Sequence, residues 1–215
     1  MRRVQKTPGG TDGEAEEAPL KLINKLVITN RNPNGDAKRL CTQLRKMLDP
    51  ECLTHLKEKH PRLKDCLMMA DHYLISHIVV VTGSEMQVGV RPTGATYSFK
   101  ILEYEDNFKN YGPEFYKAPA FVTFEGRSPL RSLFEKFGRN EAGFRRSLHF
   151  CFEGDKIFVR HYWYRTEDTD ENFRVGLREI GPRLTLQLTG IEEGLYPGLR
   201  KDATKSSKRN EKEVG

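Results

Sequence analysis

The 215-residue sequence predicts an α/β fold made of two similar halves. Short apolar runs typical of strands alternate along the chain with stretches whose apolar residues recur at helical spacing. The same order of strand, turn, helix and later strands then occurs a second time. Hydrophobic residues make up 37% of the chain and include 12 Phe, which suffices for a core although charged residues reach 31%. A fully disordered chain is therefore excluded.

The first half is predicted to begin with a strand at residues 26–29, ended by the turn-forming run NRNPNG. Asn34 or Asp36 is a candidate N-cap for the helix that follows, and Pro50 marks its end. A second helical region is expected over 51–74, interrupted by Pro61. The apolar residues of the first helix fall at steps of three and four, namely Ala37, Leu40, Cys41, Leu44, Met47 and Leu48. Three further strands are expected at 77–82, 87–91 and 96–102.

The second half repeats these signals. A strand is predicted at 120–124 and a short helix at 130–137. The run EGD at 153–155 separates two apolar runs and predicts a hairpin, and 184–189 alternates like a strand with one buried face. Residues 166–172 are acidic and are interpreted as an exposed linker.

Gly-containing turns lead into an alternating strand in both halves, at 94–96 and at 181–183. Such sharp strand entries favour Gly because it adopts positive φ without steric cost. The repeated order predicts two homologous α/β units, although strand–turn–helix is a common motif and a chance match is the alternative.

The chain is expected to contain one ordered body with polar ends. Residues 1–18 and 199–215 have few apolar residues and are predicted to be disordered, the second segment being basic. The body then covers 19–198, with halves at about 19–113 and 114–198. No apolar run approaches the roughly 18 residues of a membrane span, and no secretory signal is recognised, so no membrane partner is expected.

Motifs for catalysis or metal binding are absent from the sequence. The four Cys, at 41, 52, 66 and 151, have no CxxC spacing and are expected to be reduced, with no metal and no cofactor. Phosphate-binding loops, H-E-x-x-H and G-x-S-x-G are also missing. His161 has no nearby candidate nucleophile and is interpreted as a packed strand residue. We therefore expect no enzyme, an RNA-modifying activity being the least favoured alternative.

Positive charge concentrates in the first half. The formal net charge is +6, and residues 36–65 hold eight Lys or Arg against five Asp or Glu. These cations form a candidate RNA-binding face, because neutralising phosphates releases counterions, although a solvated surface is the competing interpretation. Tyr97, Tyr162 and Trp163 are candidates either for stacking on bases or for core packing. The candidate RNA-binding residues are Lys38, Arg39, Arg45, Lys46, Lys57, Lys59, Arg62, Lys64 and Arg183.

The two strand entries resemble those of Brix-domain proteins. Residues 179–188, EIGPRLTLQL, closely resemble the E-[IV]-G-P-R entry of that family. The first-half counterpart, usually P-x-G-P-T-x-x-F, stands here as PTGATYSF at 92–99, with Ala95 in place of the second proline. The resemblance covers about residues 20–196. It implies a Brix-type domain of two similar α/β halves with mixed sheets, in which Gly94, Gly181 and Pro182 form structural turns. Arg183 is then a candidate either for RNA contact or for a structural ion pair.

Within the family, the sequence resembles the Peter Pan (suppressor of sterile four) branch. The segments LKEK at 56–59, LKD at 63–65 and RHY at 160–162 resemble parts of that branch. The resemblance implies a non-enzymatic ribosome-biogenesis factor of the nucleolus that binds precursor ribosomal RNA during large-subunit assembly and processing. It implies partners among pre-ribosomal particle proteins, including a small helical assembly factor. The alternative is a protein-interaction scaffold in a small-subunit precursor particle, as in another Brix branch.

Overall fold

The computed structural model describes residues 23–30, 32–54, 62–92, 94–108, 111–139, 145–169 and 172–197. The predicted disordered ends, 1–18 and 199–215, lie outside these ranges. Within them, no helix is long and apolar enough to cross a membrane.

The elements of the first half follow the predicted order. They are β1 (Lys25–Thr29), α1 (Gly35–Met47), β2 (Cys52–Leu53), α2 (Leu63–His72), β3 (His77–Thr82), β4 (Glu85–Val90) and β5 (Ala95–Glu105). The second half contains a short 3-10 helix, η1 (Pro113–Tyr116), followed by β6 (Phe121–Glu125), α3 (Arg131–Glu135), β7 (Arg146–Glu153), β8 (Lys156–Thr169), β9 (Asn172–Glu179) and β10 (Arg183–Glu193).

The described residues form one mixed ten-stranded sheet in the order β2-β1-β3-β4-β5-β10-β8-β7-β6, with β9 added on β8. In the first half β1 and β3 are parallel, and β3, β4 and β5 are antiparallel neighbours. In the second half β6 and β7 are parallel, and β7, β8 and β10 are antiparallel neighbours. The α/β class with two similar halves is thus confirmed, and both halves contribute to a single continuous sheet.

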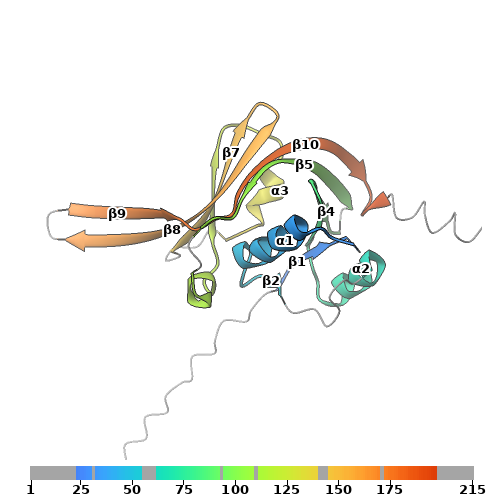
Figure 1. Ribbon diagram of the computed structural model, residues 1–215, viewed down its shortest axis with the longest axis horizontal. Helices are drawn as coiled ribbons and strands as arrows, with labels where there is room; N and C mark the ends of the chain where they lie inside the picture. Colours follow the sequence, from blue (N-terminus) through green and yellow to red (C-terminus); the bar gives the residue numbers. More distant parts are fainter. Residues whose placement is uncertain are drawn as a thin grey trace, which may run out of the picture.

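The two halves join through the antiparallel pair β5 and β10. Arg183 at the start of β10 lies opposite Glu105 at the end of β5, and Glu193 lies opposite Ala95. The two long strands run side by side and arch over α1 (Figure 1). This pairing relates the halves by an approximate two-fold rotation, because each strand plays the same part in its own half.

Helix α1 forms where the sequence predicts it. Asn34 is the N-cap, and its side-chain Oδ1 accepts a hydrogen bond of 2.8 Å from the Ala37 backbone N–H. Asp36 in the first turn and Lys46 in the last complement the helix dipole. All six predicted apolar positions, from Ala37 to Leu48, are buried.

One core cluster spans both halves. It takes Leu40 and Leu44 from α1, Phe134 from α3, and Phe99 and Leu184 from the central strands. Helices α1 and α3 therefore cover the same face of the sheet. The opposite face of β1 and β3 packs against α2 in a second cluster that includes Cys66 and Ala70.

Three sequence-based expectations differ from the structure. The first is the start of the second helical region, since residues 52–53 form strand β2. Cys52 and Leu53 pair in parallel with β1 there. Residues 55–61, which include Pro61, lie outside the described ranges.

The second difference concerns residues 166–172, which were predicted to form a linker. That prediction was wrong for the described residues of this segment, 166–169 and 172. Strand β8 continues to Thr169 and β9 begins at Asn172. The acidic composition suggested a loop, but cross-strand pairing between β8 and β9 satisfies the backbone there. The third difference is that strand β9 and helix η1 were not predicted. The four cysteines lie in the described residues and form no disulfide there.

Candidate nucleic-acid interface

The predicted basic residues of α1 divide into exposed and internally bonded groups. Lys38 and Arg39 are exposed. Arg39 forms ion pairs with Asp36 at 2.5 Å and with Asp106 at 3.8 Å. Arg45 is half-buried, and its Nε donates a 2.9 Å hydrogen bond to the Val27 carbonyl. Of these three, Lys38 and Arg39 are thus the two whose side chains are exposed to solvent.

The remaining predicted cations are spread over two faces of the sheet. Half-buried Lys46 lines a hollow with Asp106 and Phe108, next to the turn at Pro182. Arg62 and Lys64 are exposed at the start of α2, which packs on the face opposite to α1. Lys57 and Lys59 lie outside the described residues. The predicted residues that the structure describes therefore do not come together in a single surface.

Arg183 is held by carboxylates. Its Nε and Nη2 donate to the two carboxylate oxygens of Glu179 at 2.7 and 2.6 Å, and its Nη1 donates to Glu105 at 3.2 Å. The hydrogen bonds and charge of Glu179, then the charge of Glu105, raise the pKa of Arg183. Of the two interpretations left open by the sequence, this geometry is that of the ion pair.

The glycine turns have the backbone conformation that favours glycine. Gly94 has φ of 78° and Gly181 has φ of 66°. A Cβ at Gly181 would lie 2.2 Å from Cδ2 of Phe108, so packing as well as backbone conformation requires glycine there. Pro182 is buried and leads directly into β10.

A buried Arg–His pair beside this turn links the two halves. Arg146 is 1% exposed, and its Nε and Nη2 donate to the Ala118 carbonyl at 3.0 and 2.7 Å. Its guanidinium also donates to the carbonyls of Asp49 and Tyr116, after the end of α1 and in η1. The arginine therefore satisfies carbonyls from segments far apart in the sequence.

His161 completes this cluster. Its ring is fully buried, with Nδ1 2.7 Å from the Gly181 carbonyl and Nε2 3.2 Å from Arg146 Nη1. Nδ1 therefore donates to Gly181 and Nε2 accepts from Arg146, which requires neutral imidazole. Burial, with the charge of Arg146, lowers the pKa of His161 to about 3. These contacts confirm the expectation of a packed strand histidine.

A second buried network also crosses between the halves. Lys25 and Glu51 form a buried ion pair, and Arg139 of the second half donates to the same carboxylate. Burial lowers the pKa of Lys25, although Glu51 opposes the shift. Nearby His77 packs edge-on against Phe137, and burial lowers its pKa to about 4. Both networks are occupied with internal contacts, and the described residues contain no group of three or more possible metal ligands.

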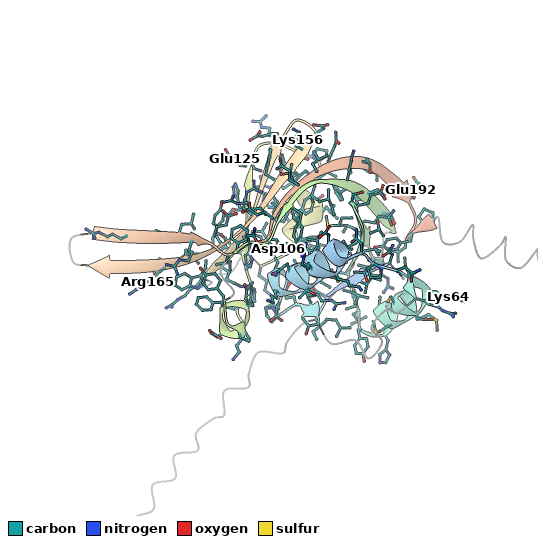
Figure 2. All side chains as sticks on the ribbon, viewed as in Figure 1. Lys64, Asp106, Glu125, Lys156, Arg165 and Glu192 are labelled. Carbon is teal, nitrogen blue, oxygen red and sulfur yellow. The ribbon has the colours of Figure 1, made fainter. Side chains whose placement is uncertain are left out.

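The hairpin of β8 and β9 carries a basic surface that the sequence analysis missed. It projects beyond the rest of the sheet in Figure 1. Arg165, labelled in Figure 2, and Arg174 and Arg178 are exposed on it. The signal was present in residues 172–179, where Arg174, Gly176 and Arg178 alternate with apolar residues, as in a two-faced strand.

The comparisons with known proteins agree with this fold. The Brix domain model matches residues 30–190. A protein of Drosophila melanogaster named "Probable ribosome production factor 1" is 29% identical over 187 residues. The match covers 80% of this chain and 46% of that protein, so the chain spans less than half the length of this relative. Since the family model covers most of the chain, including both glycine turns, the chain belongs to the Brix domain family.

Proposed function

We propose that this chain is a non-enzymatic ribosome-biogenesis factor that binds precursor ribosomal RNA during large-subunit assembly and processing, in the nucleolus. The observation that carries the proposal is the Brix domain match over residues 30–190, supported by the name of the Drosophila relative. The Peter Pan branch is compatible with that match and stays a prediction.

The distribution of charge supports RNA as the ligand. The net charge is +6, and Lys38 and Arg39 are exposed on α1. Cations on a folded frame bind phosphates through counterion release, which needs no deep pocket. The buried titratable groups, His161 and Lys25, are engaged in internal bonds, which suits a binding protein.

One observation favours the second candidate, a protein-interaction scaffold in a small-subunit precursor particle. Val175 and Leu177 are 56% and 62% exposed on β9. The register places them opposite Thr166 and Tyr164, so they share one side of the hairpin. An exposed apolar strip of this kind suits a protein partner, such as the expected helical assembly factor.

In-cell ultraviolet crosslinking with sequencing of the attached RNA tests the proposal. We expect reads concentrated on large-subunit precursor RNA. Reads concentrated on small-subunit precursor RNA would instead favour the second candidate function, a scaffold in a small-subunit precursor particle. Absence of enrichment above an uncrosslinked control would reject RNA binding and leave the scaffold role.

A variant pair identifies the contribution of α1. Lys38→Glu with Arg39→Glu is expected to weaken RNA binding and its salt dependence if these residues contact phosphate. Arg45 is left unchanged because its hydrogen bond to Val27 supports the fold. Arg62→Glu with Lys64→Glu, on the opposite face of the sheet, is the matched comparison, and equal loss in both pairs would mean that neither face is specific.

A further inference from the structure

One side of the hairpin of β8 and β9 continues the face of the sheet that α1 and α3 cover. It extends beyond these two helices. Along β8, Val159 and His161 point into the core beneath the helices. Because strand side chains alternate, Trp163 and Arg165 lie on that same side. Trp163 is still packed by Phe115 of η1, at 5.6 Å between ring centroids. Beyond it, the next residue of β8 on this side is Arg165.

Cross-strand register assembles three arginines on this side. Trp163 lies opposite Arg178, Arg165 lies opposite Gly176, and Arg174 lies opposite Glu167. Directly opposite residues share a side of an antiparallel pair, so Arg165, Arg174 and Arg178 form one surface, here called the arginine face. Its levels follow one another at about 7 Å along the hairpin. Gly176 adds no side chain between Arg174 and Arg178.

The arginine face is open to solvent. All three arginines are exposed. Arg174 and Arg178 form no ion pair with any side chain that the structure describes. One nearby carboxylate, Glu179, belongs to the other side and is bound to Arg183. On the side of the arginine face, the three arginines outnumber one acidic residue, Glu167, and leave a net positive charge.

The base of the hairpin adds an aromatic platform beside these charges. A hollow of about 380 Å³ is lined by Phe115, Arg145 and Trp163, together with Glu114, Ala118 and Arg146. Arg145 is exposed and Trp163 is half-buried. A guanidinium next to an accessible indole is a combination that binds a phosphate and an adjacent base together.

We infer that the arginine face is the principal RNA-binding surface of this chain, binding the phosphate backbone with its arginines and a base at the hollow beside Trp163. This inference rests on the proposed function and names the part of the molecule that performs it. The exposed apolar residues of β9, Val175 and Leu177, lie on the reverse side of the hairpin. The charge on the arginine face therefore favours RNA over a protein on that side.

The test measures binding of the full chain to a fluorescent RNA stem-loop with a single-stranded flank, between about 50 and 200 mM salt. The variant Arg165→Gln, Arg174→Gln, Arg178→Gln is compared with Lys100→Gln, Arg127→Gln, Lys156→Gln. The second set removes the same charge from exposed positions outside the arginine face. Thermal unfolding followed by far-ultraviolet circular dichroism verifies that each variant is folded.

We expect the hairpin variant to raise Kd about tenfold or more and to reduce the slope of log K against log salt by about 2. The control set should change Kd by less than about threefold. Equal Kd values for the two sets would overturn the inference while leaving the proposed function in place. Failure of the unmodified chain to bind the RNA would overturn both.

The reverse side of the hairpin gives a further control. Val175→Ser with Leu177→Ser is expected to leave Kd unchanged. If this pair weakens RNA binding and the arginine variant does not, the RNA lies on the other side and the inference is wrong. Trp163→Leu should weaken binding of the flanked stem-loop more than binding of the same stem without its flank. Equal effects on the two RNAs would contradict the proposal that a base binds beside Trp163.

Discussion

Gly181 brings backbone conformation and side-chain packing together at one residue. Its φ of 66° disfavours a side chain, and Phe108 occupies the space that a Cβ would need. Its carbonyl accepts the hydrogen bond from His161. The turn therefore holds the start of β10 against the buried cluster that links the halves.

Gly181→Ala is expected to lower the free energy of unfolding by about 2–4 kcal/mol, from left-handed backbone strain together with the clash against Phe108. Gly154→Ala is the matched control, because Gly154 has φ of 61° and no atom lies within 4 Å of the place where its Cβ would stand. It should cost only about 1–2 kcal/mol. Urea unfolding measures both, and equal losses would show that Phe108 does not constrain the turn.

Two buried histidines make stability depend on pH. The unfolded chain protonates its histidines below about pH 6.5, whereas burial lowers the pKa of His161 to about 3 and of His77 to about 4. Below pH 6.5 the unfolded state thus binds more protons, and stability falls as pH drops. We expect a loss of about 2–4 kcal/mol between pH 7 and pH 5 from these two groups.

Urea unfolding at several pH values checks this dependence. His161→Gln should be less stable at pH 7 yet lose less stability on acidification. An unchanged slope in His161→Gln would contradict the assignment.

At the scale of elements, Arg146 does for α1 what a capping residue does for an isolated helix. Its guanidinium reaches carbonyls at the C-terminal end of α1 and in the segment after η1 while extending from β7. Carbonyls at a helix end have no partner within the helix, and burial makes an unsatisfied carbonyl costly. One side chain thus fixes three elements relative to one another.

Arg146→Met is expected to destabilise the fold by about 3–5 kcal/mol, because it leaves His161 and several buried carbonyls without their donor. The adjacent Arg145→Met is the control, since Arg145 is exposed, and it should change stability by less than about 0.5 kcal/mol. Thermal and urea unfolding compare the two. Similar stabilities would mean that water replaces the guanidinium without cost.

In contrast to Arg146, the outer part of the hairpin of β8 and β9 contributes little to the stability of the fold. Its outer residues, from Arg165 to Arg178, are exposed wherever their side chains are described, and none of these belongs to either core cluster. Substitutions in an element of this kind usually change the free energy of unfolding only slightly. That separation makes the arginine face suitable for variants that report on binding alone.

At the scale of the whole molecule, the two halves form one cooperative unit. The core cluster takes residues from both halves, β5 pairs with β10 along most of their length, and Glu51 contacts cations from each half. Exposing one half would leave apolar surface and buried charges without partners. The two halves are therefore repeats of one topology that share a core, and the boundary near residue 113 stays a prediction.

We expect unfolding followed by far-ultraviolet circular dichroism to coincide with unfolding followed by fluorescence of Trp163, the one tryptophan of the chain. The first probe reports on both halves and the second on the second half. Two distinct midpoints would indicate halves that unfold separately. A chain divided after residue 113 should likewise fail to give two folded fragments.

Much of the local structure was predictable from the sequence. The helix from Gly35 to Met47 follows from its capping residue and its apolar spacing, and strands β3, β7 and β10 follow from their apolar runs. These features depend on neighbours in the chain, so a single sequence carries them. The linker at 166–172 was misjudged because strand pairing outweighed a composition typical of loops.

The candidate site was predicted less well, because its contacts join residues that are distant in the sequence. Lys38 and Arg39 lie on a solvent-facing helix surface, where RNA contact stays a prediction, and nothing near Arg45 in the sequence indicates its bond to Val27. The arginine face needed the register of two strands, in which residues such as Arg165 and Gly176 become neighbours.

The sequence by itself determined the class of fold, the repeated halves, the glycine turns and the family. Periodicity, turn chemistry and short motifs depend on residues close together in the chain, so they can be recognised in the sequence alone. Only the tertiary structure decided which cations face solvent and which are bonded internally. Arg146 and Asp49 are 97 residues apart and still share a hydrogen bond, and such contacts are set by how the elements pack.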